Sequence, residues 1–321
     1  MITSVSVLSA RNAWSAIDQI ACDVDYSYFC VEMALAPKDG GDSINISDGQ
    51  IPSHWIGSAA RGFGLTGSTK TSDIINLFQN GFLPDGRVVR PPHVSMAMSI
   101  LAIAAQKSIS ILQAHPDEQV RRAADTAMLA GEAAVIEALE ACARSQIGTS
   151  AKNDPRLAPA QGIVASSWQH RSSSTMTPYS YMDIAILSTA PCADGKWRKI
   201  DILGAIKMAD AAAIFAIEKS ISKSLGLSDN DWTKPTMSDS TQYREIKSLL
   251  KFINPLSEER KSVSEIAKKI DATMVLNGDA AVAIRNHWNE ACGGELFKAF
   301  DNIRVKENPT PEPGVVISFG R

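Results

Sequence analysis

The 321-residue sequence predicts an α+β fold, in which a strand-containing core is followed by a helical C-terminal part. Short apolar segments of strand length recur along the first two-thirds of the chain. Two long segments with helical spacing of apolar residues separate and follow these strand candidates. From Asp231 onward the pattern is helical and more charged. These three observations favour a mixed architecture over an all-helical or an all-strand one.

The predicted strands begin with Ile2–Leu8, where apolar and small polar residues alternate as in an edge or half-buried strand. Val94–Ala104 follows the stiff pair Pro91-Pro92 and is largely apolar, which is typical of a buried strand. Further strands are expected at Gly162–Trp168 and Met182–Thr189, and a turn at Asp194-Gly195.

The two longest predicted helices are Asp117–Arg144 and Ile202–Leu225. Asp117 and Glu118 suit the start of the first helix, because the N-terminal end of a helix attracts negative charge. The second is rich in Ala and Ile on most faces, so we expect it to be substantially buried. The other predicted helices are Asn12–Tyr28, Thr71–Gly81, Gln242–Phe252, Glu258–Ile270 and Ala280–Cys292.

Residues 1–300 are predicted to form one domain, with a sheet core over about 1–230 and a helical part over about 231–300. Pro37–Pro52 is rich in Gly, Asp, Ser and Asn and is expected to be a loop. Residues 301–321 are expected to be a Pro-rich C-terminal tail.

Composition excludes several classes of protein but names no activity. With 45% hydrophobic residues and a net charge of −3, the chain is predicted to fold and shows no overall basic field for nucleic acid. The longest apolar run, Ala211–Ile217, is far shorter than the roughly 18 residues that a membrane span needs. Five dispersed cysteines without a CxxC pair argue against a disulfide framework, so a reducing cytoplasm is expected.

Few residues point to chemistry by themselves. The sequence contains no Walker A, GxGxxG or GxSxG motif, and its five histidines form no HxH or HExxH pair. Tyr26 and Tyr28 are candidate nucleophiles, since a phenolate can attack phosphorus and hold a covalent link to DNA. The residues alone favour the alternative, a pair of half-buried tyrosines at the end of a helix.

Four groups of segments, taken in order, give these residues a context. Their order and spacing resemble the relaxase domain of the MobF (TrwC/TraI-type) conjugative relaxases, from about Leu8 to about Gly294. The last of them, with the sequence DGKWR, is the most distinctive. The groups are His54–Gly57 with Gly62–Gly67 and Leu77–Gly86; Gln106–Leu112; Trp168–His170 with Pro178–Asp183; and Asp194–Asp201 with the long helix after it.

The resemblance implies both a fold and an activity. Such relaxases have an HUH fold, a central antiparallel sheet flanked by helices, with C-terminal helices closing over single-stranded DNA. They cut one strand at a plasmid transfer origin and stay joined to its 5′ end through a tyrosine. Three histidines hold a divalent metal that polarises the scissile phosphate, and an Asp orients one of them. The implied partners are single-stranded DNA at a transfer origin and other conjugation proteins, in the bacterial cytoplasm.

The departures from this family fall on its metal site. The first histidine ligand corresponds to His170, which is present, but the paired His-x-His corresponds to Tyr181-Met182-Asp183. The orienting Asp corresponds to Ile100, which we expect beside His170. His170 and Asp183, which we expect to face each other, would hold Mg²⁺ or Mn²⁺ weakly at most, so no cofactor is expected.

The departures extend to the nucleophiles. The first tyrosine pair of the family corresponds to Ser15–Asp18, which contains no tyrosine, and only Tyr26 and Tyr28 match the second pair. The resemblance places Lys107, Trp197, Arg198 and Lys199 against DNA, although Trp197 is equally consistent with a core anchor at a strand end.

These observations favour a relaxase-like, DNA-processing protein of plasmid conjugation. The leading hypothesis is a single-stranded-DNA-binding or accessory pseudoenzyme that has lost metal-dependent nicking. The second hypothesis is an active tyrosine DNA strand transferase with an altered metal site. The third is a structural or interaction module without DNA binding, to which the near-neutral net charge lends weight.

Overall fold

A five-stranded antiparallel sheet lies at the centre of the protein. The computed structural model describes residues 2–21, 26–35, 53–90, 95–149, 155–238, 241–257, 274 and 279–305. The sheet has the strand order β1-β3-β7-β6-β2, and every adjacent pair is antiparallel. Its strands are β1 (Ile2–Ser9), β2 (Ser53–Ile56), β3 (Met96–Ala104), β6 (Ala165–Ser172) and β7 (Pro178–Leu187).

Two smaller sheets extend this core. Only Ser188 separates β7 from β8, so the chain passes almost directly into a second sheet of order β5-β4-β9-β8. Gly195, with φ +75°, makes the tight turn between β8 and β9, as the sequence predicts. The remaining strands are β4 (Arg144–Thr149), β5 (Pro155–Pro159), β8 (Thr189–Pro191), β9 (Trp197–Asp201), β10 (Thr236–Ser238) and β11 (Thr241–Tyr243).

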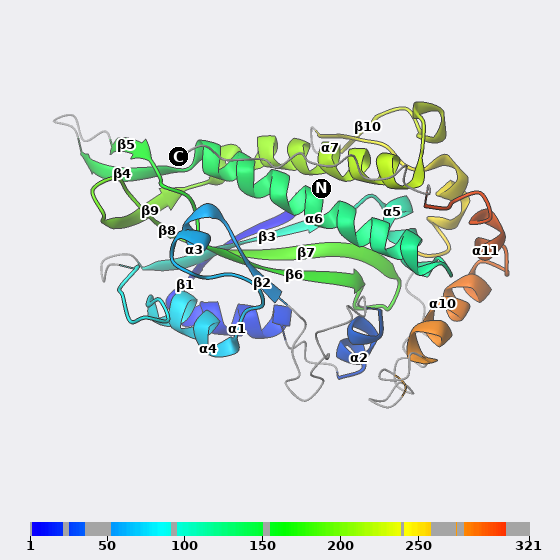
Figure 1. Ribbon diagram of the computed structural model, residues 1–321, viewed down its shortest axis with the longest axis horizontal. Coiled ribbons are helices and arrows are strands. Elements are labelled where there is room, and N and C mark those ends of the chain that lie inside the picture. The colour runs from blue at the N-terminus through cyan, green and yellow to red at the C-terminus, as the bar shows by residue number, and fades with distance from the viewer. Residues whose placement is uncertain are drawn as a thin grey trace, which may run out of the picture.

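Helices cover both faces of the central sheet (Figure 1). The long helices α6 (Glu118–Cys142) and α7 (Ile206–Leu225) lie on one face, and α1 (Ala10–Ala21) and α4 (Thr71–Ile74) lie on the other. The other helices are α2 (Tyr26–Leu35), α3 (Ser58–Gly62), η2 (Ile75–Asn80), α5 (Lys107–Ile111), η3 (Leu112–Ala114), η4 (Leu203–Ala205), η5 (Asp229–Asp231), η6 (Lys247–Phe252), α10 (Asp279–Ala291) and α11 (Leu296–Ala299).

Strand alternation divides the buried apolar residues into two clusters. Alternate residues of β3 and β7, such as Leu101 and Ile184, pack with α6 and α7 in one cluster. Residues on the opposite face of these strands, such as Met98 and Ala185, belong to the second cluster, which also contains Ile17 of α1. The central sheet is therefore buried on both faces.

The structure confirms that the predicted strands around positions 94–103, 162–168 and 182–189 are neighbours in one sheet, and that the first strand is an edge. Several helix predictions need correction. The helix expected over Asn12–Tyr28 corresponds in the described residues to α1, which ends at Ala21, and to the start of α2, which is apolar and packs against β6 and α10. Glu258–Ile270, the loop Pro37–Pro52 and residues 306–321 of the predicted tail lie outside the described residues. The first residues of that tail are packed on the domain, since Ile303 is 3% exposed and belongs to the core.

Two further corrections reflect tertiary contacts that override local patterns. Gln242 and Tyr243 belong to β11, where they pair with β10, and the helix after them is a 3₁₀ segment starting at Lys247. The helix expected to be substantially buried, α7, buries one side only, and Phe215 on its outer side is 68% exposed. The C-terminal part is nonetheless mainly helical, as predicted.

Close approach of α6 and α7 depends on a glycine. A Cβ atom at Gly131 would lie 2.7 Å from Cγ1 of the fully buried Ile217 on α7. No side chain fits there without displacing Ile217, because protein cores are close-packed. Gly131 therefore sets the distance between the two helices that cover this face.

We expect Gly131→Leu to lower the free energy of unfolding by about 1–3 kcal/mol, since overpacking outweighs the better helix propensity of Leu. Ala133→Leu, at an exposed position on the same helix, is the matched control and should change stability little. Urea unfolding of both variants measures the difference. Equal stability of the two variants would contradict this account of the packing.

Candidate functional site

The paired strands β6 and β7 bring together three side chains singled out in the sequence. His170 pairs with Tyr181, and Asp183 lies two residues further along β7 on the same face. His170 Nε2 lies 3.6 Å from Oδ2 of Asp183. We call His170, Tyr181 and Asp183 the central site. The expectation that His170 faces Tyr181 and Asp183 is confirmed.

The central site is dominated by stacked rings. The imidazole of His170 and the phenol of Tyr181 are nearly parallel, with centroids 4.3 Å apart and an interplanar angle of 6°. Tyr179, on the same face of β7, packs against Tyr181 at 5.2 Å with a 34° tilt. Lys107 Nζ lies 5.9 Å from the centroid of the Tyr179 ring. A row of rings therefore leads from His170 to a lysine. Tyr179 was missed by the sequence reasoning, although its alternation with Tyr181 signals the shared face.

Burial sets the charges of the central site. His170 is 1% exposed, and burial, reinforced by the neighbouring Arg171 cation, lowers its pKa to about 3. Burial also raises the pKa of Asp183 to about 6. At neutral pH the contact therefore joins a neutral imidazole to a largely ionised carboxylate, and it is not an ion pair.

The prediction that Ile100 lies beside His170 is wrong. Ile100 pairs with Ala185, which is four residues beyond Tyr181 on β7. The β3 residue in the same cross-strand row as Tyr181 and His170 is Ala104. Ile100 does lie on β3 and on the same face of the sheet as His170. Its neighbours across the sheet, however, depend on the register between β3 and β7, which the sequence spacing does not reveal.

The helix that carries the tyrosine pair is attached to the strand that carries His170. Tyr26 and Tyr28 lie in the first turn of α2, and the structure describes only the backbone there. Glu32 of the same helix is 2% exposed. Its carboxylate accepts hydrogen bonds from the backbone N–H of Arg171 at 2.8 Å, the N–H of Ser172 at 2.7 Å and the Ser172 hydroxyl.

This buried carboxylate attaches α2 to β6 at the two residues that follow His170, Arg171 and Ser172. Burial raises the pKa of Glu32, although its hydrogen bonds and the Arg171 cation act in the opposite direction. Glu32 lies six residues, or about 9 Å along the helix axis, from Tyr26. The tyrosine pair and the central site are therefore held in one part of the fold. The sequence offered no signal for Glu32 beyond a lone acid in an apolar helix.

Arg171 is held from the opposite face of the sheet. Its Nε lies 3.1 Å and 3.2 Å from the two carboxylate oxygens of Asp125 on α6. Asp125 also accepts hydrogen bonds from the amides of Gln113 and Gln169, at 3.0 Å and 2.9 Å. Because a buried carboxylate needs several donors, this cluster restrains the C-terminal end of β6.

Lys107 lies close to the central site, but its ammonium is largely buried and hydrogen-bonded rather than exposed to solvent. Its Nζ donates to the carbonyl of Pro178, at the start of β7, at 2.7 Å. Burial lowers its pKa to about 8, against the opposing effect of Glu245. Glu245 accepts from the backbone N–H groups of Lys107 and Ser108, at 3.2 Å and 2.8 Å, and thereby caps α5.

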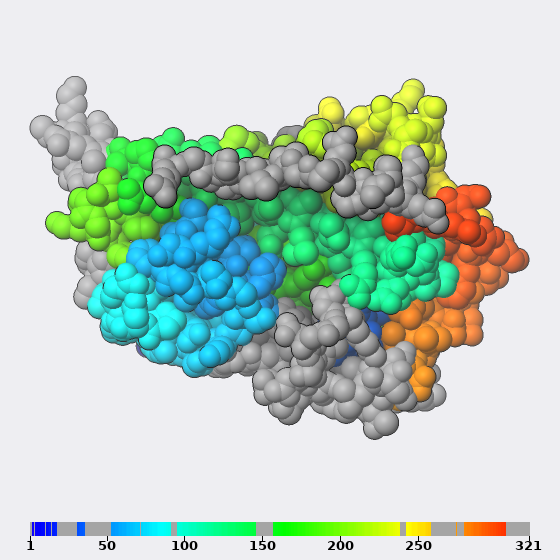
Figure 2. All heavy atoms as spheres, in the orientation of Figure 1, coloured from blue at the N-terminus to red at the C-terminus, as the bar shows by residue number. Residues whose placement is uncertain are grey.

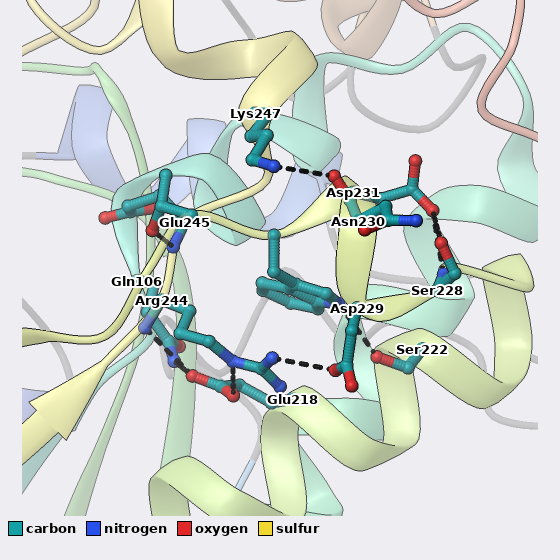
Figure 3. Close-up of polar contacts among 12 residues, drawn as sticks. Gln106, Glu218, Ser222, Ser228, Asp229, Asn230, Asp231, Arg244, Glu245 and Lys247 are labelled. Atoms are coloured by element: carbon teal, nitrogen blue, oxygen red, sulfur yellow. Dashed lines mark hydrogen bonds and ion pairs between the residues drawn. The ribbon is translucent and has the colours of Figure 1, made fainter.

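Figure 3 shows the polar network behind this cap. Arg244 donates through Nε to Glu218 at 2.9 Å and through Nη1 to Asp229 at 2.9 Å. The Gln106 amide donates to the same Glu218 at 3.1 Å. The C-terminal part is thus tied through α7 to the turn that carries Lys107.

The structure does not bring the other predicted DNA contacts to the central site. Trp197, Arg198 and Lys199 lie on β9 in the second sheet, where Trp197 pairs with Pro191, ten residues beyond Tyr181. Trp197 packs against the Phe63 ring at 5.1 Å and against the core. Arg198 pairs with Asp194 at 2.5 Å, and Lys199 is exposed.

The donor atoms at the central site do not fit a three-histidine metal centre. They comprise one imidazole, one carboxylate and a phenol whose ring stacks on the imidazole. In the part of the chain that the structure describes, no three His, Cys, Asp or Glu side chains are grouped so that they could hold a metal ion. None of the described helices has the length and apolar character needed to span a bilayer.

Comparison with solved structures supports the fold. The chain is similar to the conjugative relaxase TrwC in complex with oriT DNA in a copper-bound form, at TM-score 0.60 and 19% identity, over 91% of this chain and 98% of that chain. It is also similar to TrwC complexed with a 27-mer DNA comprising the recognition hairpin and the cleavage site, at TM-score 0.59 and 18% identity, over 91% and 98%.

A metal-bound TrwC complex with oriT DNA matches at TM-score 0.60 and 18% identity, over 91% of this chain and 97% of that chain. At these identities the likeness shows a shared fold. A search of the curated proteins finds no match. The family model described as TrwC relaxase matches residues 26–288, which include the tyrosine pair, the central site and β9. Because this match covers most of the sequence, the chain belongs to the TrwC relaxase family.

Proposed function

We propose that this chain binds single-stranded DNA at a plasmid transfer origin, as a relaxase-like protein of bacterial conjugation that has lost metal-dependent nicking. The family and the fold support DNA as the ligand, because related structures are TrwC complexes with oriT DNA. In this proposal the protein acts in the cytoplasm with other conjugation proteins.

The observation that carries the loss of nicking is the Tyr181 ring stacked on His170, in the strand position where the family has an imidazole ligand. Phosphoryl transfer depends on positioned positive charge at the scissile phosphate. A neutral His170, an acidic Asp183 and a phenol supply none. Two cations lie near the row of rings, and both are engaged: the Lys107 ammonium by the carbonyl of Pro178, and Arg171 by the carboxylate of Asp125.

A second candidate function is an active tyrosine strand transferase that works without the family's metal. One observation favours it: Glu32 attaches the helix of Tyr26 and Tyr28 directly beside His170, where a nucleophile would be needed. The two candidates differ in whether a covalent protein–DNA adduct forms.

We expect the wild-type protein to bind Mn²⁺ no more tightly than about 10⁻⁴ M, since a single imidazole and carboxylate form an incomplete site. Isothermal titration calorimetry measures this affinity. The double variant Tyr181→His with Asp183→His restores the paired histidines and should gain one stoichiometric site. A single tight site in the wild type would contradict the loss of the metal centre.

For DNA, we expect binding of single-stranded oligonucleotides in the presence of EDTA, with an affinity that falls steeply as salt rises, because phosphate contacts release counterions. Incubation with oligonucleotides that tile the cognate transfer origin, with Mg²⁺ or Mn²⁺, should give no covalent adduct on a denaturing gel. An adduct that disappears in Tyr26→Phe or Tyr28→Phe would establish the strand transferase instead. Absence of any DNA binding would reject both candidates.

The pH dependence of stability tests whether a cation neutralises Asp183. Because burial raises the pKa of this carboxyl to about 6, the folded state holds the proton more tightly than the unfolded state. The contribution of Asp183 to the free energy of unfolding should therefore fall as pH rises from about 4 to about 6, whereas that of His170, whose pKa is lowered to about 3, rises over the same range. Asp183→Asn isolates the Asp183 contribution, and it should stabilise the protein by about 3 kcal/mol at neutral pH but little near pH 4.

Denaturant unfolding at the two pH values measures the effect, and Asp301→Asn at an exposed position is the control. Adding Mn²⁺ should leave the stability difference between the wild type and Asp183→Asn unchanged at both pH values, whereas a cation bound to the ionised carboxylate would reduce it at neutral pH. A reduced difference would argue for a retained metal site.

A further inference from the structure

We propose that Phe63, Trp197 and Arg87 form a stacking site for an unpaired nucleobase, at the opposite end of β7 from the central site. We call these three residues the aromatic ladder. The inference rests on the proposed binding of single-stranded DNA, and it assigns a second contact point and its chemistry.

In the aromatic ladder, the Phe63 ring contacts both an indole ring and a guanidinium group. The Phe63 and Trp197 ring centroids lie 5.1 Å apart at 37°, and Cζ of Arg87 lies 4.8 Å from the centroid of Phe63. Phe63 thus contacts both groups, and the Phe63 and Trp197 side chains are half-buried, so part of each remains accessible. Contacts of this kind are favourable for arginine over an aromatic face and for offset ring pairs.

Three separate segments position the ladder. Phe63 directly follows α3, and its N–H donates to the carbonyls of Ala59 and Ala60 at 3.1 Å. Gly64, with φ +77°, then turns the chain sharply. Arg87 is oriented by Asp85, which accepts from its Nε at 2.6 Å. The guanidinium plane is thus held while its side chain remains 54% exposed.

The surroundings of the ladder suit a polyanion with apolar faces. Lys199 lies on the same face of β9 as Trp197, because the two are two residues apart in a strand. The exposed ammonium of Lys199 is available to bind a phosphate of a strand that stacks on Trp197. Phe82 and Val88, which form a β-bridge beside Arg87, are 41% and 55% exposed.

Two acidic groups close to the ladder are engaged by cations. Asp85 pairs with Arg87, and Asp194 pairs with Arg198. Among the described residues no ion pair occupies Lys199, Lys196 or Arg61. Figure 2 shows that residues 53–90, drawn from blue to cyan, lie on the surface of the visible face.

This combination favours an unpaired base over duplex DNA or a protein. In a duplex both faces of each base are covered by stacking, whereas a single strand presents free faces to aromatic side chains. Trp197 pairs with Pro191, ten residues along the chain from Tyr181, so the ladder lies up to about 30 Å from the central site. A bound strand would therefore meet the ladder several nucleotides away from the position of the central site.

Fluorescence anisotropy with a labelled oligothymidylate of about 15 nucleotides tests the proposal, over a range of salt concentrations. We expect Phe63→Leu to weaken binding about tenfold without changing the salt dependence, because it removes a ring and keeps an apolar side chain. Phe63→Tyr should bind like the wild type. Lys199→Ala should instead reduce the salt dependence by about 0.7 in the slope of log affinity against log salt.

The matched control is Phe215→Leu. Phe215 is also an exposed phenylalanine near a lysine, with Lys219 Nζ 5.8 Å from its ring, and it lines a surface pocket of about 360 Å³ on α7. It should bind DNA like the wild type. Circular dichroism and thermal unfolding confirm that each variant folds.

Two results would overturn the proposal. If Phe63→Leu binds the oligothymidylate as tightly as Phe215→Leu does, the aromatic ladder is structural packing or serves a protein partner. If Phe63→Leu loses equal affinity for a duplex of the same length, the ladder does not read unpaired bases. Failure of the wild type to bind any single strand would instead reject the proposed function on which the inference rests.

Discussion

The antiparallel pairing of β6 with β7 is the constraint on which the rest of the site depends. This register sets His170 opposite Tyr181 and places Asp183 on the same face. A slip by one residue would turn these side chains to the α6–α7 face, where the sheet packs on apolar helix residues. Two contacts of Arg171 hold the C-terminal end of β6 in this register: Glu32 of α2 accepts from its backbone N–H, and Asp125 of α6 accepts from its guanidinium.

The same end of the sheet is tied to the C-terminal part of the chain. Glu245 caps α5, Lys107 of α5 bonds to the start of β7, and Arg244 and Gln106 share the carboxylate of Glu218. Each link joins elements far apart in the sequence through a charged or backbone partner. The central site is therefore held in place by α2 and α6 at the end of β6, and by α5 with the C-terminal part at the start of β7.

The sequence predicted much of this, and its failures share a cause. The strands around His170 and Asp183 could be located, because apolar runs and the motifs of the TrwC family fall on them. The placement of Ile100 beside His170 failed, since a residue count along one strand does not reveal its register on the next. Glu32 and Phe63 were missed because their partners are separated from them by many residues. Tyr179 was missed although its alternation with Tyr181 on the same strand was visible in the sequence.

By itself the sequence determined the family, four of the five strands of the central sheet with the longest helices, and the residue types that a metal site would lack. These properties are local, since they depend on periodicity and on the identity of residues within a motif. Only the tertiary structure decided that His170 stacks on Tyr181, that Lys107 is partly buried, and that Trp197 lies with Phe63 at the far end of β7. Those facts depend on strand register and on packing between distant segments, because burial and neighbouring side chains set the charge and reach of each group.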